Sequence, residues 1–137
     1  MGARGAGREA ALQMLFALEA NGAATAAQTI ASFWRETPGD PEGRSYADRA
    51  VEGVAGELEV IDQAIRTAST NWRLERMGRV DRNVLRLGTW ELMRVPEVPR
   101  AVVIDEAVEL AKRFGSEDSG AFVNGVLDRV AENLAQS

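Results

Sequence analysis

Residues 80–130 contain the three blocks that decide the fold: VDRNVLRLGTWEL (80–92), PRAVVIDEAVELAKRFG (99–115) and FVNGVLDRV (122–130). Apolar residues recur every three or four positions in each block, which is the period of one face of an α-helix. A short Pro-bounded loop and a Ser/Asp-rich turn separate the blocks. The second half of the chain is therefore expected to form three consecutive helices packed through their apolar faces.

The first half shows the same helical period and no convincing strand alternation. REAALQMLFALE (8–19) predicts a buried amphipathic helix, and Thr25 suits the N-cap of a second helix. That second helix is expected to end before the loop PGDPEG (38–43). Residues 1–7, which include three glycines, are expected to form a flexible arm.

A long apolar seam follows the loop. From Ala47 to Trp72, apolar residues recur at alternating steps of four and three, which predicts that one buried stripe continues through residue 72. Gly53 and Gly56 are poor helix formers, so a kink or joint is expected within residues 57–60. The prediction is a single all-α domain over residues 1–137, with six or seven helices in two packed three-helix groups that the loop at 37–43 and the turn at 76–80 suggest.

Three local features refine this prediction. Gly78 suits a helix C-cap, and Asp81 then suits the N-cap of the next helix. Ser116 is expected to cap the last helix, and Phe114 is expected to lie in the core. Gly125 is interpreted as the residue that lets two helices approach closely.

The composition argues against an enzyme. The chain has 45% apolar residues, enough for a closed core, and it has neither cysteine nor histidine. A catalytic pair among its 21 Asp and Glu residues would need a pocket that raises one pKa. We therefore expect no catalysis and no cofactor. No apolar run approaches the ~20 residues needed to span a bilayer, and residues 1–10 lack a signal-peptide apolar region, so a cytoplasmic protein without membrane contact is expected.

The charge balance bears on possible partners. The net charge of -5 does not favour a protein that grips RNA over its whole surface. Lys112 is the single lysine among 16 basic residues, and the rest are arginine, which pairs with phosphate and stacks on bases. The arginine bias is equally consistent with a GC-rich genome. Local RNA-binding patches remain compatible with an acidic chain.

The order and spacing of the three blocks resemble the NusB family, and REAALQMLFALE and IDQAIRTASTNW (61–72) extend the resemblance over nearly the whole chain. NusB proteins are small all-helical factors of bacterial transcription antitermination. They bind a boxA-type RNA of ribosomal operons together with the ribosomal protein NusE. The resemblance implies that this chain holds boxA-like RNA, with NusE, against the transcription elongation complex.

The resemblance also implies an RNA-binding surface. On this basis the RNA-binding residues are expected to be Arg4, Arg8, Gln13, Asp118, Phe122 and Asn124. The arginines would contact phosphates, although the family usually has a denser arginine cluster here, and Phe122 would stack on an unpaired base. The alternatives are a disordered tail for the arginines, an ordinary surface role for Gln13, a core position for Phe122 and a backbone hydrogen bond for Asn124.

The family resemblance places the NusE partner beside the junction of the two halves. The expected interface residues are Leu18, Glu75, Arg76 and Asp81, with the acidic ones pairing with basic residues of the partner. Asp81 could also serve only as a helix cap. The arginines of residues 73–86 recur at steps of three and four, but Gly78 interrupts the helix, which favours a solvated charge run over a basic stripe.

Two alternatives compete with the antitermination hypothesis. One is a non-catalytic helical interaction scaffold of the same fold with weak or lost RNA binding, which the acidic charge and sparse N-terminal arginines would explain. The other is the accessory domain of an RNA cytosine methyltransferase. The length and the absence of a cysteine nucleophile exclude the second.

Overall fold

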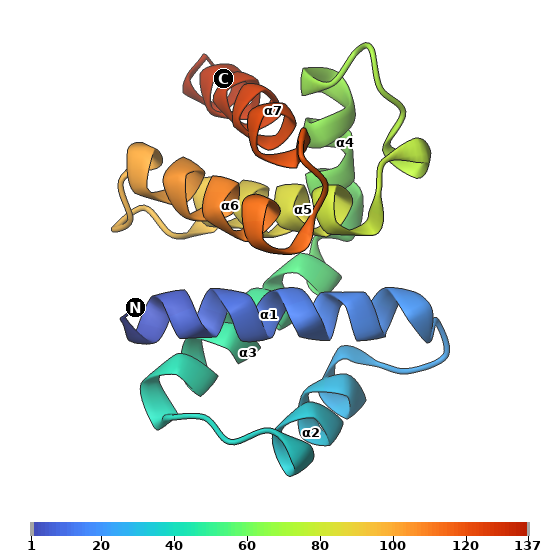
Figure 1. Ribbon diagram of the computed structural model, residues 1–137, viewed down its shortest axis with the longest axis vertical. Helices are drawn as coiled ribbons and strands as arrows, with labels where there is room; N and C mark the ends of the chain where they lie inside the picture. Colours follow the sequence, from blue (N-terminus) through green and yellow to red (C-terminus); the bar gives the residue numbers. More distant parts are fainter. Residues whose placement is uncertain (1, 137) are drawn as a thin grey trace. The chain divides into compact units, whose positions relative to one another are not determined.

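The computed structural model describes residues 2–136, and that part of the chain contains seven α-helices, one short 3₁₀ helix and no strand (Figure 1). The all-α prediction is confirmed. The helices are α1 (Ala3–Ala20), α2 (Ala26–Glu36), α3 (Pro41–Gly56), α4 (Leu58–Ala68), η1 (Leu74–Arg76), α5 (Arg79–Arg94), α6 (Arg100–Phe114) and α7 (Ser119–Ala135). None of these helices is both long and apolar enough to cross a membrane.

The chain divides into two compact units, one ending at Gly56 and the other beginning at Glu57. The first unit has three α-helices, as expected, but the second has four. The boundary therefore lies at the predicted joint within the apolar seam rather than at the turn 76–80. That turn cannot separate two groups because η1 packs on α4 and stays within the second unit.

In the first unit, α1 packs along α3, and α2 contacts both. Leu12 and Leu15 of α1 and Val51 of α3 are buried, as the apolar period predicts. A Cβ atom at Gly7 would lie 2.8 Å from the carbonyl oxygen of Gly43, so a glycine permits this close approach of α1 to α3.

The expected flexible arm is wrong for residues 3–7. Helix α1 begins at Ala3, five residues earlier than the apolar pattern indicates, and Gly7 is buried. The reason is packing against α3, because the extra turn places Arg4 and Arg8 on the ring of Tyr46. Met1 lies outside the described residues.

In the second unit, α5, α6 and α7 contact one another, and α4 packs on α5 and α7. A Cβ atom at Gly88 would lie 2.8 Å from Cδ1 of Leu127, which places the close approach of α5 and α7 at Gly88. The interpretation of Gly125 is wrong, since a Cβ there would meet nothing within 4 Å. Arg94 at the end of α5 donates to both carboxylate oxygens of Glu57, the N-cap residue of α4.

The helix boundaries agree with some predicted caps and correct others. Thr25 caps α2 as predicted: its Oγ1 accepts from the backbone N–H of Gln28 at 3.1 Å, and its own N–H donates to Oε1 of Gln28 at 2.9 Å. Gly78 is the N-cap of α5 rather than a C-cap, so Asp81 lies inside the first turn and is not the cap. Ser116 does not cap α7 either, because its N–H donates to Oγ of Ser119, the first residue of that helix.

The apolar seam ends earlier than predicted. The expected joint is confirmed, since α3 ends at Gly56 and α4 begins at Leu58. Ile61 and Ile65 are fully buried, but α4 ends at Ala68, and the residues after it no longer keep the helical register. Trp72 is therefore 65% exposed instead of buried. Phe114, the last residue of α6, is likewise 37% exposed rather than a core residue.

Candidate nucleic-acid and partner interface

The two N-terminal arginines lie on one buried tyrosine of the first unit. The guanidinium carbon of Arg4 lies 4.9 Å from the ring centroid of Tyr46, and that of Arg8 lies 5.6 Å from it. Arg8 is only 4% exposed, whereas Arg4 is half-buried. Desolvated cation–π contacts stabilise a fold by up to about 2 kcal/mol. The environment of Arg8 thus favours a role in the fold, while Arg4 retains an exposed portion that can meet a phosphate.

Gln13, further along α1, is exposed and borders a hollow of about 190 Å³ in the first unit. The rings of Phe33 and Trp34 line this hollow and meet edge to face, with centroids 4.9 Å apart. The indole N–H of Trp34 donates to Oδ1 of Asp48 at 2.6 Å. This hydrogen bond fixes the indole within the unit. Leu18 of the same helix is half-buried.

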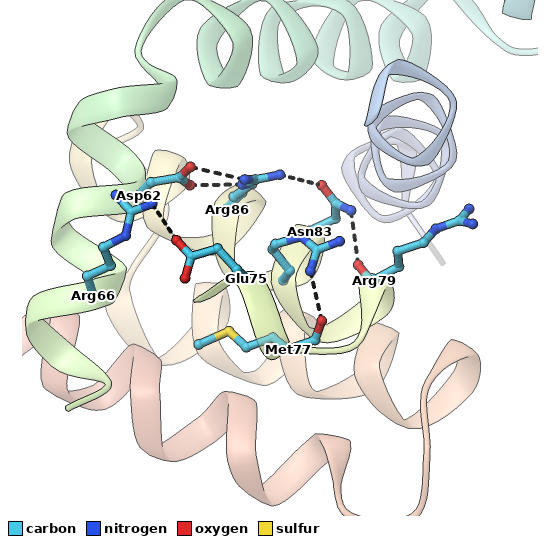
Figure 2. A network of polar contacts seen from close by, with 8 residues as sticks. Asp62, Arg66, Glu75, Met77, Arg79, Asn83 and Arg86 are labelled. Atoms are coloured by element: carbon cyan, nitrogen blue, oxygen red, sulfur yellow. Dashed lines mark hydrogen bonds and ion pairs between the residues drawn. The ribbon is translucent and has the colours of Figure 1, made fainter. Parts of the chain in front are cut away.

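In the second unit, Glu75 lies on η1 and accepts a hydrogen bond from Nη2 of Arg66 at 2.9 Å (Figure 2). Nε of Arg73 lies 3.9 Å from the other oxygen of this carboxylate. The backbone N–H of Glu75 and then the Arg66 guanidinium hold the pKa of this carboxyl below its usual range. Glu75 is therefore charged near neutral pH. Its neighbour Arg76 is exposed.

The arginines of α5 mostly serve the fold. Arg86 donates to both carboxylate oxygens of Asp62, at 2.8 and 3.0 Å, and both side chains are nearly buried (Figure 2). Nη1 of Arg82 donates to the carbonyl of Met77 at 2.8 Å. These contacts tie α5 to α4 and to the turn after η1. The arginines of residues 73–86 therefore do not form one basic stripe, as interpreted. The expected solvated charge run is wrong for Arg86, whose side chain is only 13% exposed because it pairs with Asp62.

Asp81 is half-buried in the first turn of α5, where a carboxylate interacts favourably with the positive end of the helix dipole. Asp118 is the N-cap residue of α7, although its side chain forms no capping hydrogen bond. Asn124 is exposed on the same helix.

Phe122 is half-buried on the first turn of α7, and Trp72 lies beside it. Their ring centroids are 6.3 Å apart, with the rings almost perpendicular at 86°. The two rings line a hollow of about 260 Å³ whose only charged residue is Arg129. Phe122 thus combines an aromatic neighbour with an adjoining hollow whose charged lining residue is an arginine.

The sequence did not identify Trp72 as the neighbour of Phe122, or Tyr46 as the neighbour of Arg4 and Arg8. The spacing of Trp72 continues the alternating steps of four and three and so predicts a buried position. The Ser69–Thr70–Asn71 run before it was the available signal, since such residues favour turns and end helices. Nothing in the sequence indicated that Tyr46 would receive both arginines, because 38 or more residues separate them.

These surfaces define an all-helical module that combines exposed aromatic, arginine and carboxylate side chains, the groups used to bind RNA and protein. Residues 6–132 match the model of the NusB family. The chain belongs to the NusB family.

Relatives and solved structures agree over nearly the full length. The chain is 75% identical to the transcription antitermination protein NusB of Sorangium cellulosum, over 99% of this chain and 96% of that protein. It is similar to a solved NusB structure from T. maritima, with a TM-score of 0.85 and 38% identity, covering 94% and 90% of the two chains. It is also similar to a chain in a structure of the antitermination factors NusB and NusE in complex with dsRNA, with a TM-score of 0.87, 28% identity and coverage of 97% and 98%.

Proposed function

We propose that this protein is a bacterial transcription antitermination factor that binds boxA-type RNA together with NusE during transcription of ribosomal RNA operons. The observation that carries the proposal is its full-length similarity to a structure containing NusB, NusE and dsRNA. The 75% identity to an antitermination protein supports the same function. In this role the protein acts in the cytoplasm, within the elongation complex, as a binding factor without catalysis.

The RNA-binding residues that we propose are Arg4 and Gln13 in the first unit, and Asp118, Phe122 and Asn124 in the second unit. Arg4 supplies positive charge for phosphates, and Phe122 supplies a ring for an unpaired base. Gln13 and Asn124 are exposed and can hydrogen-bond RNA. Arg8 contributes by holding α1 on Tyr46, which fixes the position of Arg4.

The NusE-binding residues that we propose are Leu18 in the first unit, and Glu75, Arg76 and Asp81 in the second unit. Glu75 is a charged carboxylate near neutral pH and suits a basic partner. Asp81 is a second acidic residue that suits a basic partner, and it is half-exposed in the first turn of α5. Complementary charge at such an interface raises association rates and excludes wrong partners.

A pull-down with the NusE homologue, with and without boxA RNA, tests partner and ligand together. We expect the pair to bind the RNA more tightly than this acidic protein alone, because a basic partner offsets repulsion between the chain and phosphates. Asp81→Lys should weaken the NusE complex in titration calorimetry while the protein keeps its helical circular dichroism. Unchanged affinity for NusE would remove Asp81 from the interface.

A second candidate function is an interaction scaffold that binds NusE without RNA. The burial of Arg8 favours it, because only two arginines stand in the N-terminal segment and one is 4% exposed. Under this candidate, NusE binds with equal affinity whether or not RNA is added, and no RNA is retained by the pair.

A further inference from the structure

Trp72 is the most exposed large apolar residue in the described part of the chain, at 65% of its surface. It follows α4, on the segment that leads into η1. Ser69 holds this segment by donating from its hydroxyl to the carbonyl of Trp72 at 3.2 Å. An exposed tryptophan on a fixed segment keeps a large apolar ring in contact with water. The folding of this chain by itself gives no reason for that exposure.

The contact with Phe122 leaves much of the ring surface open. The two rings are perpendicular, so the edge of one meets a face of the other. Trp72 remains 65% exposed despite this contact. Trp72 also borders two hollows, one of about 260 Å³ shared with Phe122 and Arg129, and one of about 330 Å³ on the side of Arg66 and Arg73. A flat group can therefore approach this aromatic pair from either hollow.

The residues that line the two hollows beside Trp72 carry a net positive charge, opposite in sign to the net charge of the whole chain. Three arginines and one glutamate line the two hollows, whereas the chain carries a net charge of -5. The glutamate, Glu75, pairs closely with Arg66 at 2.9 Å and more loosely with Arg73 at 3.9 Å, and the side chain of Arg73 is 74% exposed. The other polar lining groups are neutral: Ser69, Thr70 and Asn71. Aromatic rings surrounded by arginines and neutral hydrogen-bonding groups suit a nucleotide, since bases stack on rings while arginines pair with phosphates. A basic protein surface fits this lining less well.

We propose that Trp72, paired with Phe122, is a stacking site for an unpaired RNA base, with Arg73 and Arg129 contacting the flanking phosphates. This inference rests on the proposed RNA-binding function and deepens it by adding a second aromatic platform and its phosphate contacts. Stacking on Trp72 needs no hydrogen-bond pattern from the base, so the site accepts any base that is unpaired. A base-paired strand cannot offer a base to it.

The test is fluorescence anisotropy with a single-stranded boxA-like RNA at several salt concentrations, in the presence of NusE. Trp72→Ala should weaken binding roughly 5- to 150-fold, the range typical of one lost base–aromatic stack, with little change in the slope of log affinity against log salt. Trp72→Phe should restore part of the affinity. Arg73→Ala should instead lower the slope by roughly 0.7, the value for one phosphate contact on single-stranded RNA.

The matched control is Phe114→Ala, which removes another exposed aromatic ring of the second unit that lines neither hollow. It should leave RNA affinity unchanged, and the same oligonucleotide annealed into a duplex should bind wild type and Trp72→Ala equally. The inference is overturned if Trp72→Ala binds single-stranded RNA like wild type. A loss of NusE affinity without RNA would overturn it too, because Trp72 would then belong to the protein interface. Failure of the wild-type pair to bind any RNA would refute the proposed function itself.

Discussion

Tyr46 and Trp72 are two aromatic residues with arginines nearby, and they are used in opposite ways. Tyr46 is 5% exposed and carries two arginines on its ring, one of them buried. Trp72 is 65% exposed, with arginines around the hollows on its borders. An arginine–aromatic cluster can serve as a binding site only where both groups remain accessible to a ligand. When both are desolvated, the same groups stabilise a helix pair.

The largest effect that separates the two residues is on stability. Tyr46→Ala should lower the free energy of unfolding by about 3 to 5 kcal/mol, because it leaves a cavity between α1 and α3 and removes the support of two arginines. Trp72→Ala should cost at most about 1.5 kcal/mol, the value of an aromatic pair contact. Urea denaturation followed by circular dichroism measures both. Equal losses would contradict the distinction.

The same contrast exists between two ion pairs of the second unit. Arg86→Ala should destabilise the fold by about 3 kcal/mol, because it leaves the carboxylate of Asp62 nearly buried without its bidentate partner. Arg66→Ala should cost under about 1 kcal/mol, since Arg66 and Glu75 are about half exposed. Thermal unfolding of both variants at one salt concentration is the measurement. A larger loss for Arg66→Ala would mean that the Glu75 pair supports the turn.

A smaller effect distinguishes Arg4 from Arg8. Arg8→Ala should lower stability by about 1 to 2 kcal/mol through the lost contact with Tyr46. The slope of log RNA affinity against log salt should stay unchanged in this variant. Arg4→Ala should lower that slope by roughly 0.7 at little cost in stability. Anisotropy at several salt concentrations, with NusE present, measures the slope. A changed slope for Arg8→Ala would show that this arginine reaches phosphate despite its burial.

Most of the fold was predictable because the apolar period marks the helices, and Thr25 marks the start of α2. The errors fall where contacts distant in sequence decide the outcome. Helix α1 extends to Ala3 because of Tyr46, and the close approach at Gly88 depends on Leu127. The apolar spacing of residues 47–72 could not show that α4 stops at Ala68. Of the candidate site, Phe122 came from the family resemblance, while its neighbour Trp72 needed the folded chain.

The smallest expected effect concerns the exposed carboxylate beside the Trp72 hollows. The pKa of Glu75 lies below its ordinary value of 4.5, first because of its own backbone N–H and then because of Arg66. A carboxyl whose folded pKa is lowered contributes stability above its unfolded pKa and loses it as the pH falls through the folded pKa. The contribution of the Arg66–Glu75 pair to the free energy of unfolding should therefore stay constant from about pH 8 to 5. It should decrease only below about pH 4.5, where Glu75 becomes protonated.

Arg66→Met should raise the pKa of Glu75 only in part, because the backbone hydrogen bond remains. Carboxyl-detected NMR titration measures this shift, and Glu57 is the internal control, since Arg94 lowers its pKa independently of Arg66. If Glu75 titrates identically in the variant, Arg66 does not hold it in solution. The carboxylate would then be more available to a basic partner. The three arginines and one glutamate that line the Trp72 hollows would keep the same net positive charge.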